Sequence, residues 1–84
     1  MLEKQYWAIA KAVKDYVCKL HKIRKLKTFN KLLPTHGWAE DSKGLCDYNG
    51  NIYVEIRNLD TGKLHCIYDI MDTVCHELAH LKIS

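Results

Sequence analysis

Three residues near the end of the chain, His76, Glu77 and His80, form the motif H-E-x-x-H. On an α-helix, residues four apart lie one above the other on the same face, so both imidazoles can direct a ring nitrogen at one zinc ion. Glu77 could then reach a water molecule beside that ion and act as its general base. These residue types at this spacing therefore predict a zinc site with hydrolytic chemistry.

A hydrolytic zinc site takes three protein ligands and one water, and the motif supplies two. Asp72 lies four residues before His76 and suits a hydrogen bond to an imidazole better than a bond to the metal. Asp69 is about 10 Å from His76 by helical rise, and Cys75 points about 100° away from His76.

Two further histidines, His36 and His65, fall in predicted loops, and nothing in their spacing favours a ligand role. Only four residues follow His80, and Leu81, Lys82 and Ile83 are not zinc donors. We therefore expect the chain alone to lack a complete three-residue zinc site, and to have little or no protease activity.

The elements that must position the motif can be read from periodicity. Residues 67–83 are predicted to form the helix that carries it, with His76 and His80 facing away from the core. The opposite side of that helix gathers Ile70, Met71, Val74, Leu78 and Leu81. This side is predicted to pack against an N-terminal helix and against one face of a strand, formed by Ile52, Val54 and Ile56.

The N-terminal helix is predicted over residues 2–27, because apolar residues recur there at steps of four and three. They are Leu2, Tyr6, Ile9, Val13, Tyr16, Leu20 and Ile23. We interpret this stripe as a core face, with a coiled-coil seam as the alternative. Residues 45–58 predict a hairpin or two short strands around Asn49-Gly50-Asn51. The order of helix, strands and helix predicts an α+β fold with a small antiparallel sheet, in one domain spanning residues 1–84.

Two segments together resemble a known family. The stretch from Gly44 to Ile56 (GLCDYNGNIYVEI), and the later Asp72-Thr73-Val74-Cys75-His76-Glu77-Leu78-Ala79-His80, resemble the WLM and SprT-like zinc metallopeptidases. The resemblance implies a zincin-like half-domain with a basic N-terminal helix before a small antiparallel sheet. It also implies His76 and His80 as Zn²⁺ ligands, Glu77 as general base and a protein or peptide substrate. Members with known roles cleave proteins crosslinked to DNA, and many bind DNA.

The chain departs from the family pattern after His80, where the family has a third histidine ligand and further helices. Three explanations stay open. The chain could be the N-terminal part of a larger domain, a shortened descendant, or a component completed by a partner chain. A different class of function, a non-catalytic binding or assembly module on a degenerate zincin fold, is the alternative to the peptidase.

Charge is distributed unevenly along the chain. Residues 1–31 contain nine Lys or Arg against two acidic residues, whereas residues 32–84 contain four against eight. The N-terminal helix could therefore bind nucleic acid through Lys11, Lys14, Lys19, Lys22 and Lys25. The alternative is a lysine-rich face that is simply solvated.

The chain as a whole has the composition of a folded, non-membrane protein. Its 84 residues are 48% hydrophobic and 27% charged, without an apolar run of membrane-spanning length. No signal peptide is evident at the N-terminus. We therefore expect a cytoplasmic or nuclear protein that is not secreted, with its four cysteines reduced and mostly buried.

Overall fold

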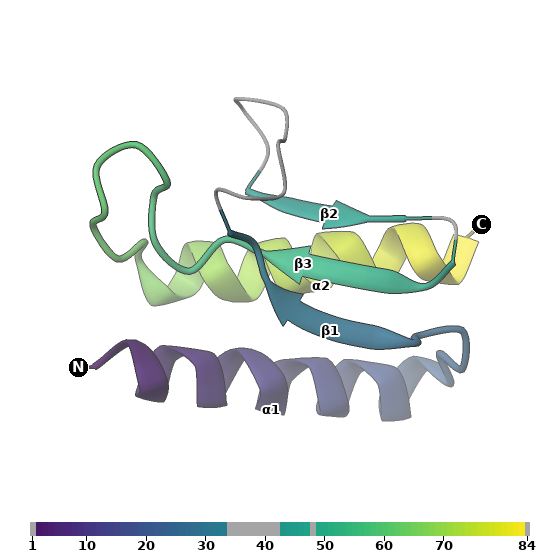
Figure 1. Cartoon of the computed structure of the whole chain (residues 1–84). Coiled ribbons are helices and arrows are strands. Elements are labelled where there is room, and N and C mark those ends of the chain that lie inside the picture. The colour runs from purple at the N-terminus through teal and green to yellow at the C-terminus, as the bar shows by residue number, and fades with distance from the viewer. Residues whose placement is uncertain (1, 34–42, 48, 84) are drawn as a thin grey trace.

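A computed structural model describes residues 2–33, 43–47 and 49–83 (Figure 1). Helix α1 spans Glu3–His21, and helix α2 spans Ile67–Ile83. Between them lie three short strands, β1 (Thr28–Lys31), β2 (Gly44–Cys46) and β3 (Asn51–Val54). The predicted order of helix, strands and helix is confirmed, and the fold class is α+β.

The sheet has the strand order β1-β3-β2, with β3 in the centre. Strands β2 and β3 form the predicted antiparallel hairpin, in which Cys46 pairs with Ile52 and Gly44 with Val54. Strand β1 pairs with β3 in parallel. The sheet is therefore mixed, and the expectation of an antiparallel sheet holds for β2 and β3 but not for β1, which runs in the same direction as its partner β3.

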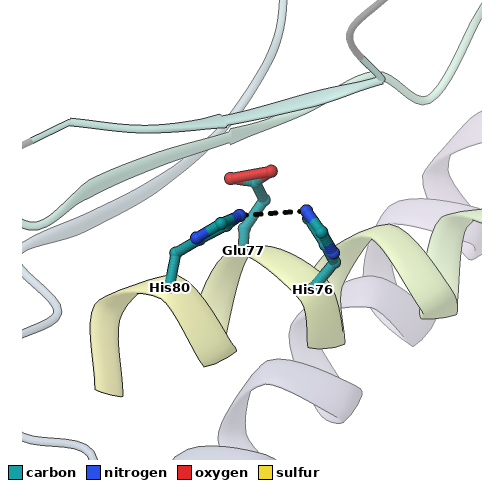
Figure 2. A group of neighbouring side chains, drawn as sticks. All are labelled: His76, Glu77 and His80. Carbon is teal, nitrogen blue, oxygen red and sulfur yellow. Dashed lines mark hydrogen bonds between the residues drawn. The ribbon is translucent and has the colours of Figure 1, made fainter. Parts of the chain in front are cut away.

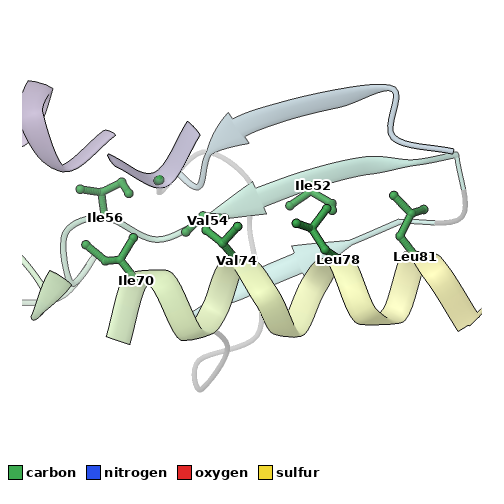
Figure 3. Close-up of a cluster of buried hydrophobic side chains, with 8 residues drawn as sticks. Ile52, Val54, Ile56, Ile70, Val74, Leu78 and Leu81 are labelled. Carbon is green, nitrogen blue, oxygen red and sulfur yellow. The ribbon is translucent and has the colours of Figure 1, made fainter. Parts of the chain in front are cut away.

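The hydrophobic core lies where the two helices meet one face of the sheet (Figure 3). Helix α2 contributes half of the fully buried cluster and packs against both α1 and the hairpin. The cluster consists of Ala10, Ile52, Val54, Ile56, Ile70, Val74, Leu78 and Leu81. The predicted contact between the apolar side of 67–83 and the strand face is confirmed, although Met71 is only half-buried.

Helix α1 ends at His21, six residues before the predicted end. Lys22 adopts a left-handed conformation (φ 54°), and the Ile23 amide donates a hydrogen bond to the Cys18 carbonyl at 2.9 Å. The chain then turns so that Ile23 and Leu26 pack against the core. Tertiary packing thus overrides the helical propensity of this lysine-rich segment, which has no glycine to mark the end.

The apolar stripe of α1 is only partly a core face. Tyr6 and Val13 pack against the core, but Leu2, Tyr16 and Leu20 are 72%, 67% and 59% exposed. The helix is rotated so that a different residue, Ala10, is its fully buried position. This rotation places Trp7 over Phe29 of β1, with ring centroids 5.1 Å apart.

Candidate metal centre

All three motif residues project from α2, on the side that Figure 2 shows facing the edge of the sheet. His76 and His80 are exposed, whereas Val74 and Leu78, on the opposite side of the helix, are fully buried. The predicted separation of a histidine face from a core face is therefore confirmed. This separation follows from the helical period, which places the apolar residues 70, 74, 78 and 81 on one side of the helix and both imidazoles on the other.

The two imidazoles already stand close to a chelating separation. Their Nε2 atoms are 3.0 Å apart, and the ring planes are inclined at 85°. Two nitrogens bound tetrahedrally to one zinc ion at about 2.0–2.1 Å would lie about 3.3–3.4 Å apart. In this structure the pair can share a hydrogen bond, with one ring donating and the other accepting. Binding a cation would require that shared proton to leave.

Glu77 is a buried carboxylate beside this pair. It is 7% exposed, and its donor atom and those of His76 and His80 all lie within 4.8 Å of one another. Among the described residues, none donates a hydrogen bond to the carboxylate. Burial raises the pKa of Glu77, while the charges of the two imidazoles act in the opposite direction. The three side chains form a group that could hold a metal ion.

Strand β2 keeps the Glu77 side chain covered. A Cβ atom placed on Gly44 would lie 3.0 Å from Glu77 Cγ and 2.7 Å from Thr73 Cγ2. Both separations are shorter than ordinary carbon contacts of about 3.5–4.0 Å. Glycine at position 44 therefore allows the strand backbone to approach α2 at the first turn of the motif. Sequence reasoning did not assign this role, because it depends on a contact between two distant segments.

An open pocket of about 870 Å³ lies beside the motif. Its walls come from the segment after α1, from the β2–β3 hairpin and from α2. The lining residues are Lys25, Gly44, Leu45, Cys46, Asp47, Asn49, Gly50, Glu77, His80 and Leu81. The carboxylate and one imidazole of the motif thus face a space large enough for a short segment of substrate.

The other candidate ligands stand apart from this group. Asp72 is exposed, and within the described ranges no hydrogen bond joins it to either imidazole, contrary to the expected supporting role. His65 instead faces Glu55, with Nε2 and Oε2 3.3 Å apart. Cys75 is exposed and lines a separate groove with Val17. His36 lies outside the described residues.

The five lysines proposed for nucleic acid lie in different local surroundings. Lys11, Lys19 and Lys22 are exposed, but Lys14 pairs with Asp15 and lies 5.8 Å from the centre of the Phe29 ring. Lys25 lines the pocket beside the metal-binding motif. The positive charge is thus divided between α1 and the pocket wall.

The state of the cysteines and the length of the helices can be compared with the sequence expectations. All four cysteines fall within the described residues and none is in a disulfide, but Cys66 and Cys75 are exposed. Cys18 and Cys46 are only half-buried, so the expectation of mostly buried thiols is wrong. Neither described helix is long and apolar enough to cross a membrane.

Comparisons of the chain with protein-family models, with curated proteins and with solved structures find no match. The resemblance to WLM and SprT-like peptidases therefore rests on the sequence segments 44–56 and 72–80 alone.

Proposed function

We propose that this chain is a zinc-dependent, peptidase-like hydrolase, in which His76 and His80 bind the metal and Glu77 is the general base. The main support is the geometry of the motif. Two imidazole nitrogens lie 3.0 Å apart, and the carboxylate of Glu77, a residue that is 7% exposed, stands within 4.8 Å of both. A surface helix that carried two histidines by chance would have no reason to bury the glutamate between them.

The donor set suits zinc among the common protein metals. Imidazole nitrogens are good ligands for zinc, whereas magnesium and calcium prefer sites made entirely of oxygen. When bound, the ion would polarise the scissile carbonyl and make the attacking water more acidic. The side chains themselves would hold the ion and receive the proton.

Glu77 is suited to the role of proton acceptor. Its burial raises the pKa of the carboxyl group, so the carboxylate is a stronger base than an exposed glutamate. The carboxylate lines the 870 Å³ pocket together with His80, so a peptide in that pocket would lie beside both groups. Glu77 would take a proton from the attacking water and pass it to the leaving amine.

Metal content and cleavage can be measured on the same set of variants. Wild-type protein dialysed against zinc should retain about one equivalent, and His80→Ala should lose it. Glu77→Gln should retain zinc but abolish any zinc-dependent cleavage of unfolded protein substrates, because it removes the proton acceptor. Asp72→Asn, a matched change of an exposed carboxylate on α2, should affect neither measurement. Absence of zinc from the wild-type protein would refute the proposal.

The non-catalytic alternative is a nucleic-acid-binding module, and the exposed Lys11, Lys19 and Lys22 favour it. Binding through phosphate contacts should be independent of sequence and should weaken as salt rises. Reversing the charge of Lys19 and Lys22 should then weaken binding to every sequence alike. A lack of association with single- or double-stranded DNA or RNA at low salt would exclude this function.

A further inference from the structure

The thiol of Cys46 faces the helix that carries the metal-binding motif. Cys46 pairs with Ile52 across the antiparallel ladder, and directly opposite residues project to the same face of a sheet. Ile52 is fully buried against the core, so Cys46 points to the same side. The cysteine is half-buried and packs against the core cluster.

The position of Cys46 along α2 follows from that of Gly44. Gly44 lies over Glu77, since its Cβ atom would be 3.0 Å from Glu77 Cγ. Strand β2 and α2 run in the same direction (Figure 1). Two strand residues advance about 6.6 Å, a little more than the 5.4 Å of one helical turn. Cys46 is thus about one turn further on, and it lines the same pocket as Glu77, His80 and Leu81.

The motif lacks one of the three protein ligands that a hydrolytic zinc site needs. If Glu77 is the base, the metal has two protein ligands, whereas hydrolytic zinc sites have three. Glu77 is more than nine-tenths buried, points into the pocket and accepts no hydrogen bond from a described residue. The charges of His76 and His80 act on this carboxylate, and the three side chains together form a group that could hold a metal ion beside the pocket.

Two unassigned donors line this pocket, Cys46 and Asp47. The Asp47 carboxylate accepts hydrogen bonds from the amides of Asn49 and Asn51 at 2.9 Å, and from Asn51 Nδ2 at 2.8 Å. It is therefore committed to the hairpin turn. Among the described residues, the Cys46 thiol has one hydrogen-bond contact, a weak one of 3.7 Å to the Asp47 carbonyl. Sulfur is the donor that can be diverted to a metal.

We propose that Cys46 is the third protein ligand, completing a His₂Cys zinc site with His76 and His80 while Glu77 stays free as the base. This inference rests on the proposed function. Binding breaks the S–H bond, releases its proton to solvent and forms a sulfur–metal bond. The thiol lies outside the 4.8 Å cluster in this structure, so its side chain must rotate about χ1 to reach the ion.

Burial raises the pKa of the Cys46 thiol, and the charge of Glu77 adds to this effect. Metal binding would depend on a free thiol at this position. Oxidation or alkylation of Cys46 would remove one of the three ligands.

Cobalt(II) titration can detect a sulfur ligand directly, because a thiolate bound to Co²⁺ absorbs in the near ultraviolet while the geometry of the ion is reported by its visible bands. Wild-type protein should show both signals under reducing conditions. Cys46→Ser should lose the near-ultraviolet band and bind Zn²⁺ at least about tenfold more weakly. The matched control is Cys75→Ser, which removes an exposed thiol beside His76 and should retain both signals.

The results separate this inference from the proposed function. Failure of wild-type protein to bind Co²⁺ or Zn²⁺ would overturn both. Visible bands that depend on His80, without a near-ultraviolet band, would overturn only the role of Cys46, as would a band that survives in Cys46→Ser. If Cys46→Ser does not fold, mass spectrometry of alkylated wild-type protein gives a second test. Zn²⁺ should protect Cys46 but not Cys75, and equal alkylation of both would refute the assignment.

Discussion

The substitution Gly44→Ala tests how closely β2 must approach α2. The new Cβ atom would lie 2.7 Å from Thr73 Cγ2 and 3.0 Å from Glu77 Cγ, so these side chains or the strand backbone must shift. Overpacking of this kind costs about 1–3 kcal/mol. Restricting the unfolded chain offsets about 0.4–1 kcal/mol, because Gly44 does not have a positive φ and alanine can adopt its conformation. We expect the free energy of unfolding to fall by about 0.5–2 kcal/mol.

Urea and thermal unfolding of the chelator-treated protein, followed by circular dichroism, would measure this loss. For a domain of this size it corresponds to a decrease in Tm of roughly 2–16 °C. Thr73→Ser removes the methyl group in the closest contact but keeps the hydroxyl that donates to the Asp69 carbonyl at 2.9 Å. The double variant should therefore be more stable than the sum of the single changes predicts. Wild-type stability of Gly44→Ala, or strict additivity in the cycle, would refute the proposed contact.

Four further substitutions test other parts of the structure by the same unfolding measurements. Glu77→Gln should raise the Tm of the chelator-treated protein at neutral pH. Burial raises the pKa of the Glu77 carboxyl group in the folded state. The protonated carboxyl group therefore contributes its full stability below the ordinary pKa of 4.5, and this contribution is lost as pH rises through the folded-state pKa. The stability gained by Glu77→Gln should therefore vanish in acid. Lys22→Gly should stabilise the chain by about 0.5–1 kcal/mol, since it relieves a left-handed lysine at the end of α1; no gain would contradict that conformation. Gly50→Ala should cost more than about 2 kcal/mol, because its Cβ atom would lie 2.1 Å from the Lys25 carbonyl. Gly62→Ala, also at a positive φ but with open space around it, should cost less.

The helix that carries the motif was predictable because its pattern is local. Apolar residues at 70, 74, 78 and 81 fix one face, and the two histidines must then lie on the other. The hairpin was predictable for the same reason, because Asn49-Gly50-Asn51 marks a tight turn and β3 alternates in burial. Each of these signals lies within a dozen or so consecutive residues.

Strand β1 and the end of α1 were not predictable in this way. Thr28–Lys31 has the short sequence TFNK and follows a run of basic residues without a turn signal. It becomes a strand because β3 offers a parallel partner and because Phe29 stacks on Trp7. Both causes come from distant parts of the chain, as does the packing of Ile23 and Leu26 that ends the helix.

The candidate site shows the same division. The residue types and spacing of His76, Glu77 and His80 were legible from the motif, including the exposure of both histidines. The burial of Glu77 was not legible, because it results from strand β2 and the close approach of Gly44. The approach of Cys46 depends on the register of the hairpin, which pairs it with Ile52.

Because α2 contributes both the motif and half of the described core cluster, metal binding and folding should be thermodynamically linked. The separation of the imidazoles depends on the helix being formed, and in isolation a helix of this length is marginal in water. A metal that binds the folded chain alone would stabilise it by about 2.7 kcal/mol at a hundredfold excess over its Kd. That is a large share of the stability of a small domain, so removal of the metal should lower the Tm.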